Sequence, residues 1–311
     1  MGKIMAVNIS EERGTQKKNV HSARLIEDWG IEHDAHAGKW HRQVSLLSYE
    51  KIEEFRKKGA PVDEGAFGEN LIIQGIDLRH LPVGTRLACG EVLLEVTQIG
   101  KQCHNGCEIF RLMGDCIMPR EGVFTRVLKG GEIKAGDEIT MLPLEKDRPF
   151  TAAIITLSDK GAAGEREDKS GPLIQEMLMK EGYDVIETLL LPDGEQPLKH
   201  QLMRLADQRQ VNVIFTTGGT GFAERDVTPE ATQAVCDRMA MGIADAIRQY
   251  SLSITGRAML SRAVSGIRKK TLIVNLPGSP KAVKESLEYV LPQLGHGLGI
   301  LRGTDGECGN S

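Results

Sequence analysis

The chain has 311 residues, which is enough for two domains with separate hydrophobic cores. Charged residues make up 26%, apolar residues 40% and aromatic residues 4%, and the net charge is -4. These values are typical of a soluble globular protein and argue against nucleic-acid binding, because neither a basic excess nor many stacking rings are present. We expect no membrane segment and no signal peptide, and six cysteines suit a reducing compartment. The composition therefore predicts a cytoplasmic protein.

The first part of the chain has short apolar runs separated by glycines, such as "QVSLLS", "ENLIIQGI" and "EVLLEVTQIG". This spacing predicts a mostly-β barrel or sandwich over residues 1–145, with one helix at residues 49–58. The polar segment 143–149, "PLEKDRP", is bounded by prolines and predicts a domain boundary.

The second part alternates between strand and helix patterns. Expected strands cover 151–158, 184–191, 211–217 and 270–276, and expected helices cover 171–182 and 198–208 and begin at Pro229 and Pro280. Such alternation predicts an α/β domain over residues 150–303, a three-layer arrangement with a mostly parallel sheet and helices on both faces. Residues 304–311 are predicted to form a flexible tail.

The stretch "VNVIFTTGGTGFAERDVTPEAT" joins a strand to a glycine-rich turn and a helix start. Glycine accepts positive φ and has no Cβ, so such a loop can surround an anion with its amides. Thr228 is suited to cap the helix, Pro229 to its first position and Glu230 to its positive end. From the glycines alone, an ordinary tight turn is almost as good an explanation.

Two further loops follow predicted strands at the same edge of the sheet. One contains Ser158 and Asp159, and the other is "NLPGSPKAV", where Ser279 can cap a helix beginning at Pro280. Open α/β sheets bind ligands at this edge, and helix starts favour anions. Neither a Walker A loop nor G-x-G-x-x-G is present, so the pattern predicts a different kind of anion pocket.

Two acidic residues lie close to these loops in the sequence. Asp226 follows the glycine loop and Asp193 lies in "LLPDGE". Two carboxylates beside a phosphate would repel it unless a cation such as Mg²⁺ lies between them. The alternative is that Asp193 belongs to a simple Asp-Gly turn and that Asp226 pairs with Arg225.

The segments "TTGGTGFAERDVTPEAT", "AMLSRAVSGIRKKTLIVNLPGSPKAV" and "LPDGE" resemble the MoaB/Mog family of molybdopterin-binding proteins over roughly residues 150–300. The resemblance implies an adenylyltransferase that uses ATP, Mg²⁺ and molybdopterin. It implies that Asp193 and Asp226 are catalytic and position the metal. The residues that it places at the substrate, together with those of the predicted loops, are Ser158, Asp159, Thr217, Gly218, Gly219, Thr220, Gly221, Ser261, Asn275, Pro277, Gly278 and Ser279.

The first domain contains a cysteine cluster, "GKQCHNGCEIFRLMGDC", with Cys103, Cys107 and Cys116. Buried core thiols, a zinc site and a reactive thiolate are all compatible with this spacing. The four histidines in "HSARLIEDWGIEHDAHAGKWH" fit loop and surface positions better than a metal site.

The segments "HDAHAGKWHRQVSLLS", "GAFGENLIIQGID" and "GVFTRVLKGGEIKAGDEI" resemble a MOSC domain over about residues 1–145. The resemblance implies that Cys103 carries sulfur or contacts the molybdenum cofactor. Cys107 and Cys116 depart from the lone-cysteine pattern and leave a disulfide, a persulfide relay and metal binding open.

The two resemblances together indicate a protein of molybdenum-cofactor biosynthesis. The second domain would adenylylate molybdopterin, and the first would handle sulfur or the finished cofactor. A non-catalytic protein that binds and delivers the cofactor is the alternative function. Expected partners are a molybdate-insertion protein or a recipient molybdoenzyme, and the resemblance implies a homo-oligomer, commonly a trimer.

Overall fold

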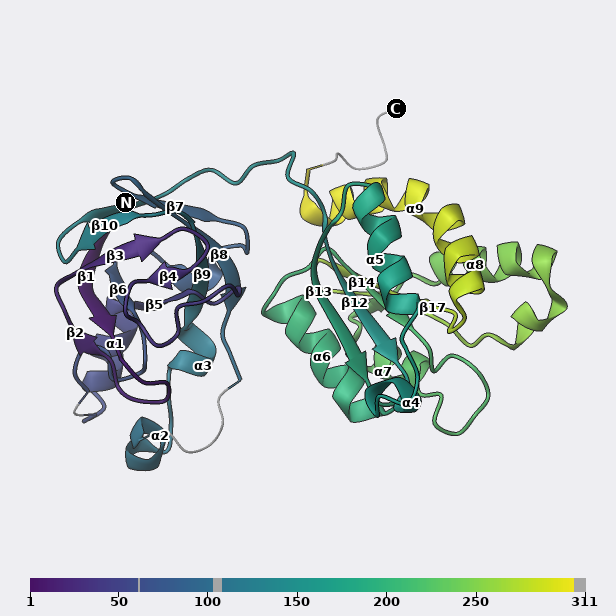
Figure 1. The fold of residues 1–311 in the computed structure, drawn as a ribbon, viewed down its shortest axis with the longest axis horizontal. Coiled ribbons are helices and arrows are strands. Elements are labelled where there is room, and N and C mark those ends of the chain that lie inside the picture. The colour runs from purple at the N-terminus through teal and green to yellow at the C-terminus, as the bar shows by residue number, and fades with distance from the viewer. Residues whose placement is uncertain (61, 103–107, 305–311) are drawn as a thin grey trace. The chain divides into compact units, whose positions relative to one another are not determined.

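The computed structural model describes residues 1–60, 62–102 and 108–304. The chain forms two compact units, Met1–Glu145 and Lys146–Ser311 (Figure 1). Cys103, Cys107 and the predicted tail beyond Thr304 lie outside the described residues. Across the described ranges, no helix combines the length and the apolar character needed to cross a membrane.

The first unit is built around a closed barrel. Among the described residues, seven strands pair in a ring and only β5 and β6 run parallel. In ring order they are β11 (Glu138–Met141), β7 (Arg86–Cys89), β8 (Val92–Ile99), β9 (Val123–Lys129), β5 (Val44–Ser48), β6 (Leu71–Gln74) and β1 (Gly2–Ile9). A short strand, β2 (Lys18–Asn19), adds to β1, and a smaller sheet contains β10 (Gly131–Lys134), β3 (Ser22–Ile26) and β4 (Gly30–Ile31). The prediction of a mostly-β barrel is confirmed.

Strand periodicity gives this barrel an inner and an outer apolar face. Leu71 and Ile73 join the inner core, whereas Ile72 between them packs outward against helix α1 (Tyr49–Arg56) through Ile52. Successive side chains of a strand point to opposite faces, so a strand covered on both faces is apolar throughout. Three shorter elements are α2 (Glu108–Met113), α3 (Met118–Glu121) and the 3₁₀ turn η1 (Leu78–His80).

The second unit contains one six-stranded sheet in its described part. Its order is β13 (Asp184–Leu191), β12 (Thr151–Leu157), β14 (Val213–Thr217), β17 (Thr271–Leu276), β16 (Ser265–Arg268) and β15 (Arg238–Met239). The first four strands run parallel, and β16 and β15 add antiparallel at the far edge. The carboxyl ends of the four parallel strands therefore meet at one edge of the sheet.

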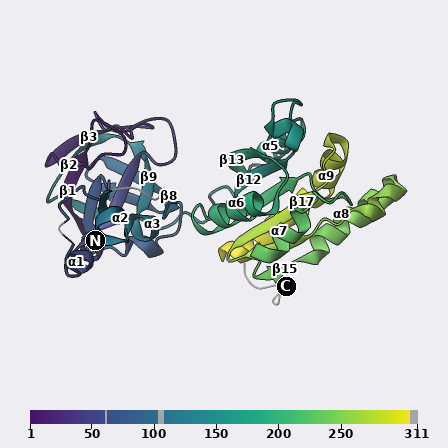
Figure 2. The ribbon, with the colours of Figure 1, turned by 90° about the horizontal axis from the view of Figure 1, so that it is seen from below.

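Helices of the second unit pack on both sides of this sheet (Figure 2). Ile154 of β12 faces one core and Ile155 faces the other. The first core includes residues of α5 (Ser170–Lys180), α8 (Met241–Ile254) and α9 (Pro280–Arg302), and the second includes α6 (Glu195–Asp207) and α7 (Thr228–Val235). Two short turns complete the unit, α4 (Asp159–Ala162) and η2 (Gly256–Leu260).

The first unit has a buried acid whose ionisation opposes folding. Burial raises the pKa of Glu69 to about 7, although its carboxylate accepts hydrogen bonds from the amides of Gly65 at 2.7 Å and Phe67 at 3.0 Å. A folded pKa above the unfolded one gives a contribution to stability that is complete below pH 4.5 and is lost as the pH rises through about 7.

We therefore predict that Glu69→Gln removes one component of the pH dependence of stability. Between pH 5 and pH 8 the parent should lose about 2 kcal/mol of unfolding free energy relative to this variant. Urea unfolding followed by tryptophan fluorescence measures this, because both tryptophans, Trp29 and Trp40, belong to the first unit. Exposed Glu132→Gln is the control and should follow the parent. Parallel curves for the parent and Glu69→Gln would contradict the prediction.

Candidate functional site

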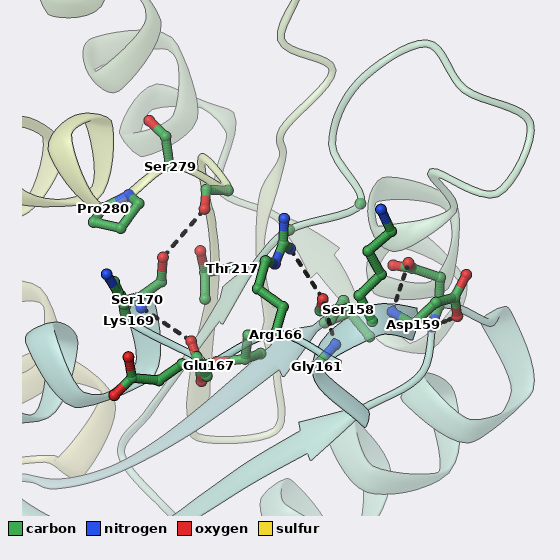
Figure 3. Close-up of a pocket in the computed structure, with 18 of the residues that line it drawn as sticks. Ser158, Asp159, Gly161, Arg166, Glu167, Lys169, Ser170, Thr217, Ser279 and Pro280 are labelled. Atoms are coloured by element: carbon green, nitrogen blue, oxygen red, sulfur yellow. Dashed lines mark hydrogen bonds between the residues drawn. The ribbon is translucent and has the colours of Figure 1, made fainter. Parts of the chain in front are cut away.

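A polar cavity lies where β12, β13, β14 and β17 end. It has a volume of about 830 Å³, and Figure 3 shows its side chains. Its lining residues are Thr156, Leu157, Ser158, Asp159, Lys160, Gly161, Arg166, Glu167, Asp168, Lys169, Ser170, Asp193, Thr217, Gly218, Gly219, Arg225, Asp226, Gly278, Ser279 and Pro280. Loops that follow four different strands thus share one cavity at the edge predicted for a ligand.

The loop after β14 needs glycine because the backbone runs too close to its neighbours for a side chain. Gly218 has φ +97°, and an added Cβ would lie 2.4 Å from the carbonyl oxygen of Leu157. Gly219 has φ +63°, and its Cβ would lie 2.4 Å from the Thr228 hydroxyl oxygen. An ordinary turn requires only the positive φ, whereas here the glycines also permit close packing.

The role expected for Thr228 was wrong. Val227 occupies the cap position of α7, and no side chain caps this helix. Thr228 is the first helical residue, and its hydroxyl donates to the carbonyl oxygen of Gly218 at 2.9 Å. This bond ties the glycine loop to the start of α7, so the threonine fixes the loop rather than the helix end.

Carboxylates form one corner of the cavity. Asp193 Oδ2 accepts from the Asp159 amide at 3.3 Å, and Asp159 Oδ1 accepts from the Asp193 amide at 2.9 Å. Asp226 Oδ2 accepts from the Ala223 amide at 2.9 Å. Burial raises the pKa of Asp193, and the negative charges of Asp159 and Asp226 add to this effect. The corner therefore favours a positive partner, as like charges held together do.

This corner does not by itself enclose a metal ion. Within the described part of the chain, no three His, Cys, Asp or Glu side chains form a group that could hold one. Asp193 and Asp226 each have one carboxylate oxygen without a hydrogen bond among the contacts above. Mg²⁺ commonly takes one or two carboxylates and completes its shell with substrate phosphates and water. The residues present fit that arrangement, and a metal there would depend on a bound phosphate.

Besides the short α4, two longer helices, α5 and α9, begin at the cavity, and they differ in what their first amides bind. Asp168 Oδ1 accepts from the amides of Ser170 at 2.9 Å and Gly171 at 3.0 Å, so a carboxylate already occupies the start of α5. Ser279 caps α9, as predicted, by accepting from the Ala282 amide at 3.3 Å. The Ser170 hydroxyl donates to the Gly278 carbonyl oxygen at 3.1 Å and joins the two loops.

Most of the residues expected from the sequence lie around this one cavity. Asp193, Asp226 and seven of the expected substrate residues line it: Ser158, Asp159, Thr217, Gly218, Gly219, Gly278 and Ser279. Thr220, Gly221, Ser261, Asn275 and Pro277 do not line it. Asn275 is fully buried and its amide nitrogen donates to the hydroxyls of Thr216 and Thr232, both at 2.9 Å, which makes it part of the framework.

The segment between α4 and α5 belongs to the first of the predicted loops, but only Ser158 and Asp159 of that loop were expected at the ligand. Arg166, Glu167, Asp168, Lys169 and Ser170 all line the cavity, and Arg166 Nη2 donates to the Ser158 hydroxyl at 3.1 Å (Figure 3). The available signal was the run "EREDKS" directly after the first strand and its loop, since charged residues at that edge face the ligand site. The segment brings two cations, Arg166 and Lys169, and two acids, Glu167 and Asp168, to the cavity.

The first unit has a second cavity, of about 810 Å³, with a different charge. Its described lining includes His36, Arg42, Lys101 and Cys116 but no aspartate or glutamate. The Arg42 guanidinium lies 4.7 Å from the ring centre of Trp40. An anionic ligand suits such a lining.

Behind His36 lies a buried ion pair. Lys17 pairs with Asp34, and Lys17 Nζ lies 3.3 Å from His36 Nδ1. Burial lowers the pKa of His36, and the charge of Lys17 lowers it further. Burial also lowers the pKa of Lys17, against the attraction of Asp34. Both effects favour the neutral imidazole of His36.

The fold and the cavity define an α/β protein whose polar site lies at the carboxyl ends of parallel strands. Residues 153–296 match the family model described as a probable molybdopterin binding domain, and residues 33–140 match that of the MOSC domain. Through its second unit the chain belongs to the MoaB/Mog family of molybdopterin-binding proteins, and its first unit carries a MOSC domain.

Several relatives match about half of the chain. The molybdopterin adenylyltransferase of Haemophilus influenzae is 44% identical over 147 residues, which is 47% of this chain and 75% of the relative. That of Escherichia coli is 43% identical over 140 residues, or 44% and 71% of the two chains. The crystal structure of the molybdopterin biosynthesis enzyme MoaB from Thermus thermophilus has 46% identity and a TM-score of 0.48, covering 50% of this chain and 97% of that one.

The packing of the glycine loop gives a prediction about stability. Gly218→Ala should destabilise the second unit by roughly 1–3 kcal/mol, because the new Cβ meets the Leu157 carbonyl and the positive φ is strained. Gly242→Ala, in α8, is the matched control, because its Cβ would find no heavy atom within 4 Å. Calorimetric unfolding compares the two, and equal transitions for both variants would refute the packing argument.

Proposed function

We propose that the second unit is a molybdopterin adenylyltransferase that uses ATP and magnesium. The observation that supports this most directly is the meeting of Asp193 and Asp226 with the glycine loop in one cavity. Relatives named molybdopterin adenylyltransferases, 39–44% identical, support the same activity. The enzyme would act in molybdenum-cofactor biosynthesis, on a phosphorylated pterin.

In this proposal the cavity residues act mainly by holding the two phosphate groups in position for the reaction. An oxygen of the terminal phosphate of molybdopterin attacks the α-phosphorus of ATP, and pyrophosphate leaves with the electron pair of the broken bond. That phosphate is largely ionised at neutral pH and needs little help from a general base. The amides of the glycine loop and the start of α9 hold phosphate oxygens in line, while Arg166 and Lys169 offset negative charge.

Asp193 and Asp226 are proposed to hold Mg²⁺ through their remaining carboxylate oxygens. When bound there, the metal would screen the charge gathered around the α-phosphorus. The raised pKa of Asp193, caused first by burial and then by its acidic neighbours, supports a corner that gains from a cation. Both carboxylates are assigned to metal positioning rather than to proton abstraction.

The first unit is proposed to handle sulfur or the molybdenum cofactor. The cavity that contains His36, Arg42 and Lys101 supports an anionic ligand of this kind. On the basis of the sequence, Cys103 is the proposed sulfur carrier or molybdenum ligand. Cys116 lines the described part of the cavity. Joining the two activities raises the local concentration of a labile intermediate.

The alternative is a protein that binds and delivers the cofactor without catalysis. The same proposal includes a homo-oligomer in the cytoplasm. Its partner would be a molybdate-insertion protein or a recipient molybdoenzyme. The decisive experiment is release of pyrophosphate from ATP by the full chain, with and without molybdopterin and Mg²⁺. Release that requires all three supports the enzyme, whereas tight molybdopterin binding without release supports the delivery protein.

For the metal assignment we predict the effect of Asp226→Asn. The variant keeps the size of the side chain but loses its charge, so pyrophosphate release should fall by about two orders of magnitude or more while molybdopterin binding is retained. Asp193→Asn should behave similarly. The control is Asp184→Asn, an exposed residue that begins β13 at the opposite end of the sheet. Near-normal turnover of Asp226→Asn at both saturating and limiting Mg²⁺ would contradict the assignment of Asp226 to metal positioning.

For the first unit we predict that Cys103 is the most rapidly alkylated of three thiols. Burial raises the pKa of both Cys89 and Cys236 to about 11, so few of these thiols are ionised at pH 7. Brief iodoacetamide treatment and mass spectrometry give the order of labelling. Cys103→Ser should also abolish cofactor maturation, whereas Cys236→Ser should not. Unimpaired maturation in Cys103→Ser would exclude the carrier role.

A further inference from the structure

Arg262 lies outside the cavity lining but holds the loop that carries Asp226. Its Nε donates to the Gly221 carbonyl oxygen at 2.7 Å, and its Nη2 donates to the carbonyl oxygen of Asp226 itself. Its Nη1 pairs with Glu230 in the first turn of α7. The Arg262 amide also donates to the Thr220 carbonyl oxygen at 3.0 Å. One residue therefore fixes both ends of the segment from Gly221 to Asp226.

This segment has little else to hold it. Ala223, Glu224 and Arg225 are exposed, and the bonds within the loop are short-range: the Ala223 amide to Asp226 Oδ2 and the Asp226 amide to the Ala223 carbonyl, both 2.9 Å. The added Cβ of Gly221 would lie 2.8 Å from Asp226 Oδ2, so the carboxylate is packed against the backbone that Arg262 binds. A planar guanidinium with several fixed donors suits such a task, and a lysine does not.

The chain on either side of Arg262 is held by a second arginine. Arg248 of α8 donates from Nε to the Ser261 carbonyl oxygen at 3.1 Å and from Nη2 to the Ala263 carbonyl oxygen at 2.8 Å. Its Nη1 pairs with Asp245 at 2.6 Å. The residues on both sides of Arg262 are thus bound by a side chain of α8.

We propose that Arg262 is a positioning residue that sets the direction of the Asp226 carboxylate, with Arg248 holding the segment that presents it. The proposal rests on the adenylyltransferase function for its catalytic consequence, but the order of the loop does not depend on that function. Residues that orient metal-binding carboxylates through hydrogen bonds typically affect metal affinity or activity about 10- to 100-fold when removed.

The test compares Arg262→Gln and Arg262→Lys with a matched control, Arg268→Gln. Arg268 is also an arginine that binds a carboxylate, Asp207, and a backbone carbonyl, that of Val235 at 2.8 Å, but it holds no residue of the cavity. Both Arg262 variants should need about tenfold more Mg²⁺ for half-maximal pyrophosphate release, with the KM for molybdopterin unchanged. Arg268→Gln should keep the parent's Mg²⁺ dependence, even if its stability falls as much.

A second measurement does not depend on turnover. Hydrogen exchange of peptides that cover residues 219–227 should be about tenfold faster in both Arg262 variants and unchanged in Arg268→Gln, because a freed loop opens locally. Arg248→Gln should speed exchange less, and adding it to Arg262→Gln should have little further effect, as expected for residues acting in series.

The outcomes distinguish the adenylyltransferase function from the positioning role of Arg262. Parent protein that releases no pyrophosphate disproves the adenylyltransferase function, while faster exchange at residues 219–227 in the Arg262 variants still supports the positioning role. Exchange and Mg²⁺ dependence equal to those of the parent in Arg262→Gln would overturn the positioning role. Full recovery of both readouts in Arg262→Lys would overturn it as well, because charge alone would then suffice.

Discussion

The close approach of the Gly218 backbone to the ends of β12 and β17 is the constraint on which the site depends. Its Cα lies 3.5 Å from the position of a Cβ on Gly278, and its own Cβ would overlap the Leu157 carbonyl oxygen. Because no side chain separates these segments, three strand ends share one cavity. The Thr228 hydroxyl then fixes the loop to α7, and Asp226 of this loop lines the same cavity as Asp193. A bulkier residue at position 218 would push apart the segments that line the cavity.

The cavity combines opposite charges at short range, and this explains how a highly charged ligand could be accepted. One corner holds Asp159, Asp193 and Asp226, and the segment between α4 and α5 supplies Arg166 and Lys169. Acids alone would repel a phosphate, and cations alone would not attract a metal ion. Arg262 binds the carbonyl oxygens of Gly221 and Asp226 and so orders the loop that carries the Asp226 carboxylate.

The two units contain cavities of similar volume but different character. The cavity of the first unit has cations and aromatic rings, with no acid among its described lining residues, and its His36 is backed by the buried Lys17–Asp34 pair. Buried charges of this kind cost free energy unless they are paired. Burial also raises the pKa of Glu69 to about 7. The two cavities thus differ in charge, because one has an acidic corner and the described lining of the other contains cations but no acid.

The sequence by itself determined the larger features: a barrel followed by an α/β unit, the glycine loop, and the edge of the sheet where the cavity lies. These follow from local periodicity and from glycine and capping patterns, which are properties of neighbouring residues. Tertiary structure alone decided that Asn275 is buried framework, that Thr228 binds Gly218 instead of capping α7, and that Arg262 reaches the Asp226 loop. Each of these depends on contacts between segments distant in the sequence, and such contacts leave no periodic signal.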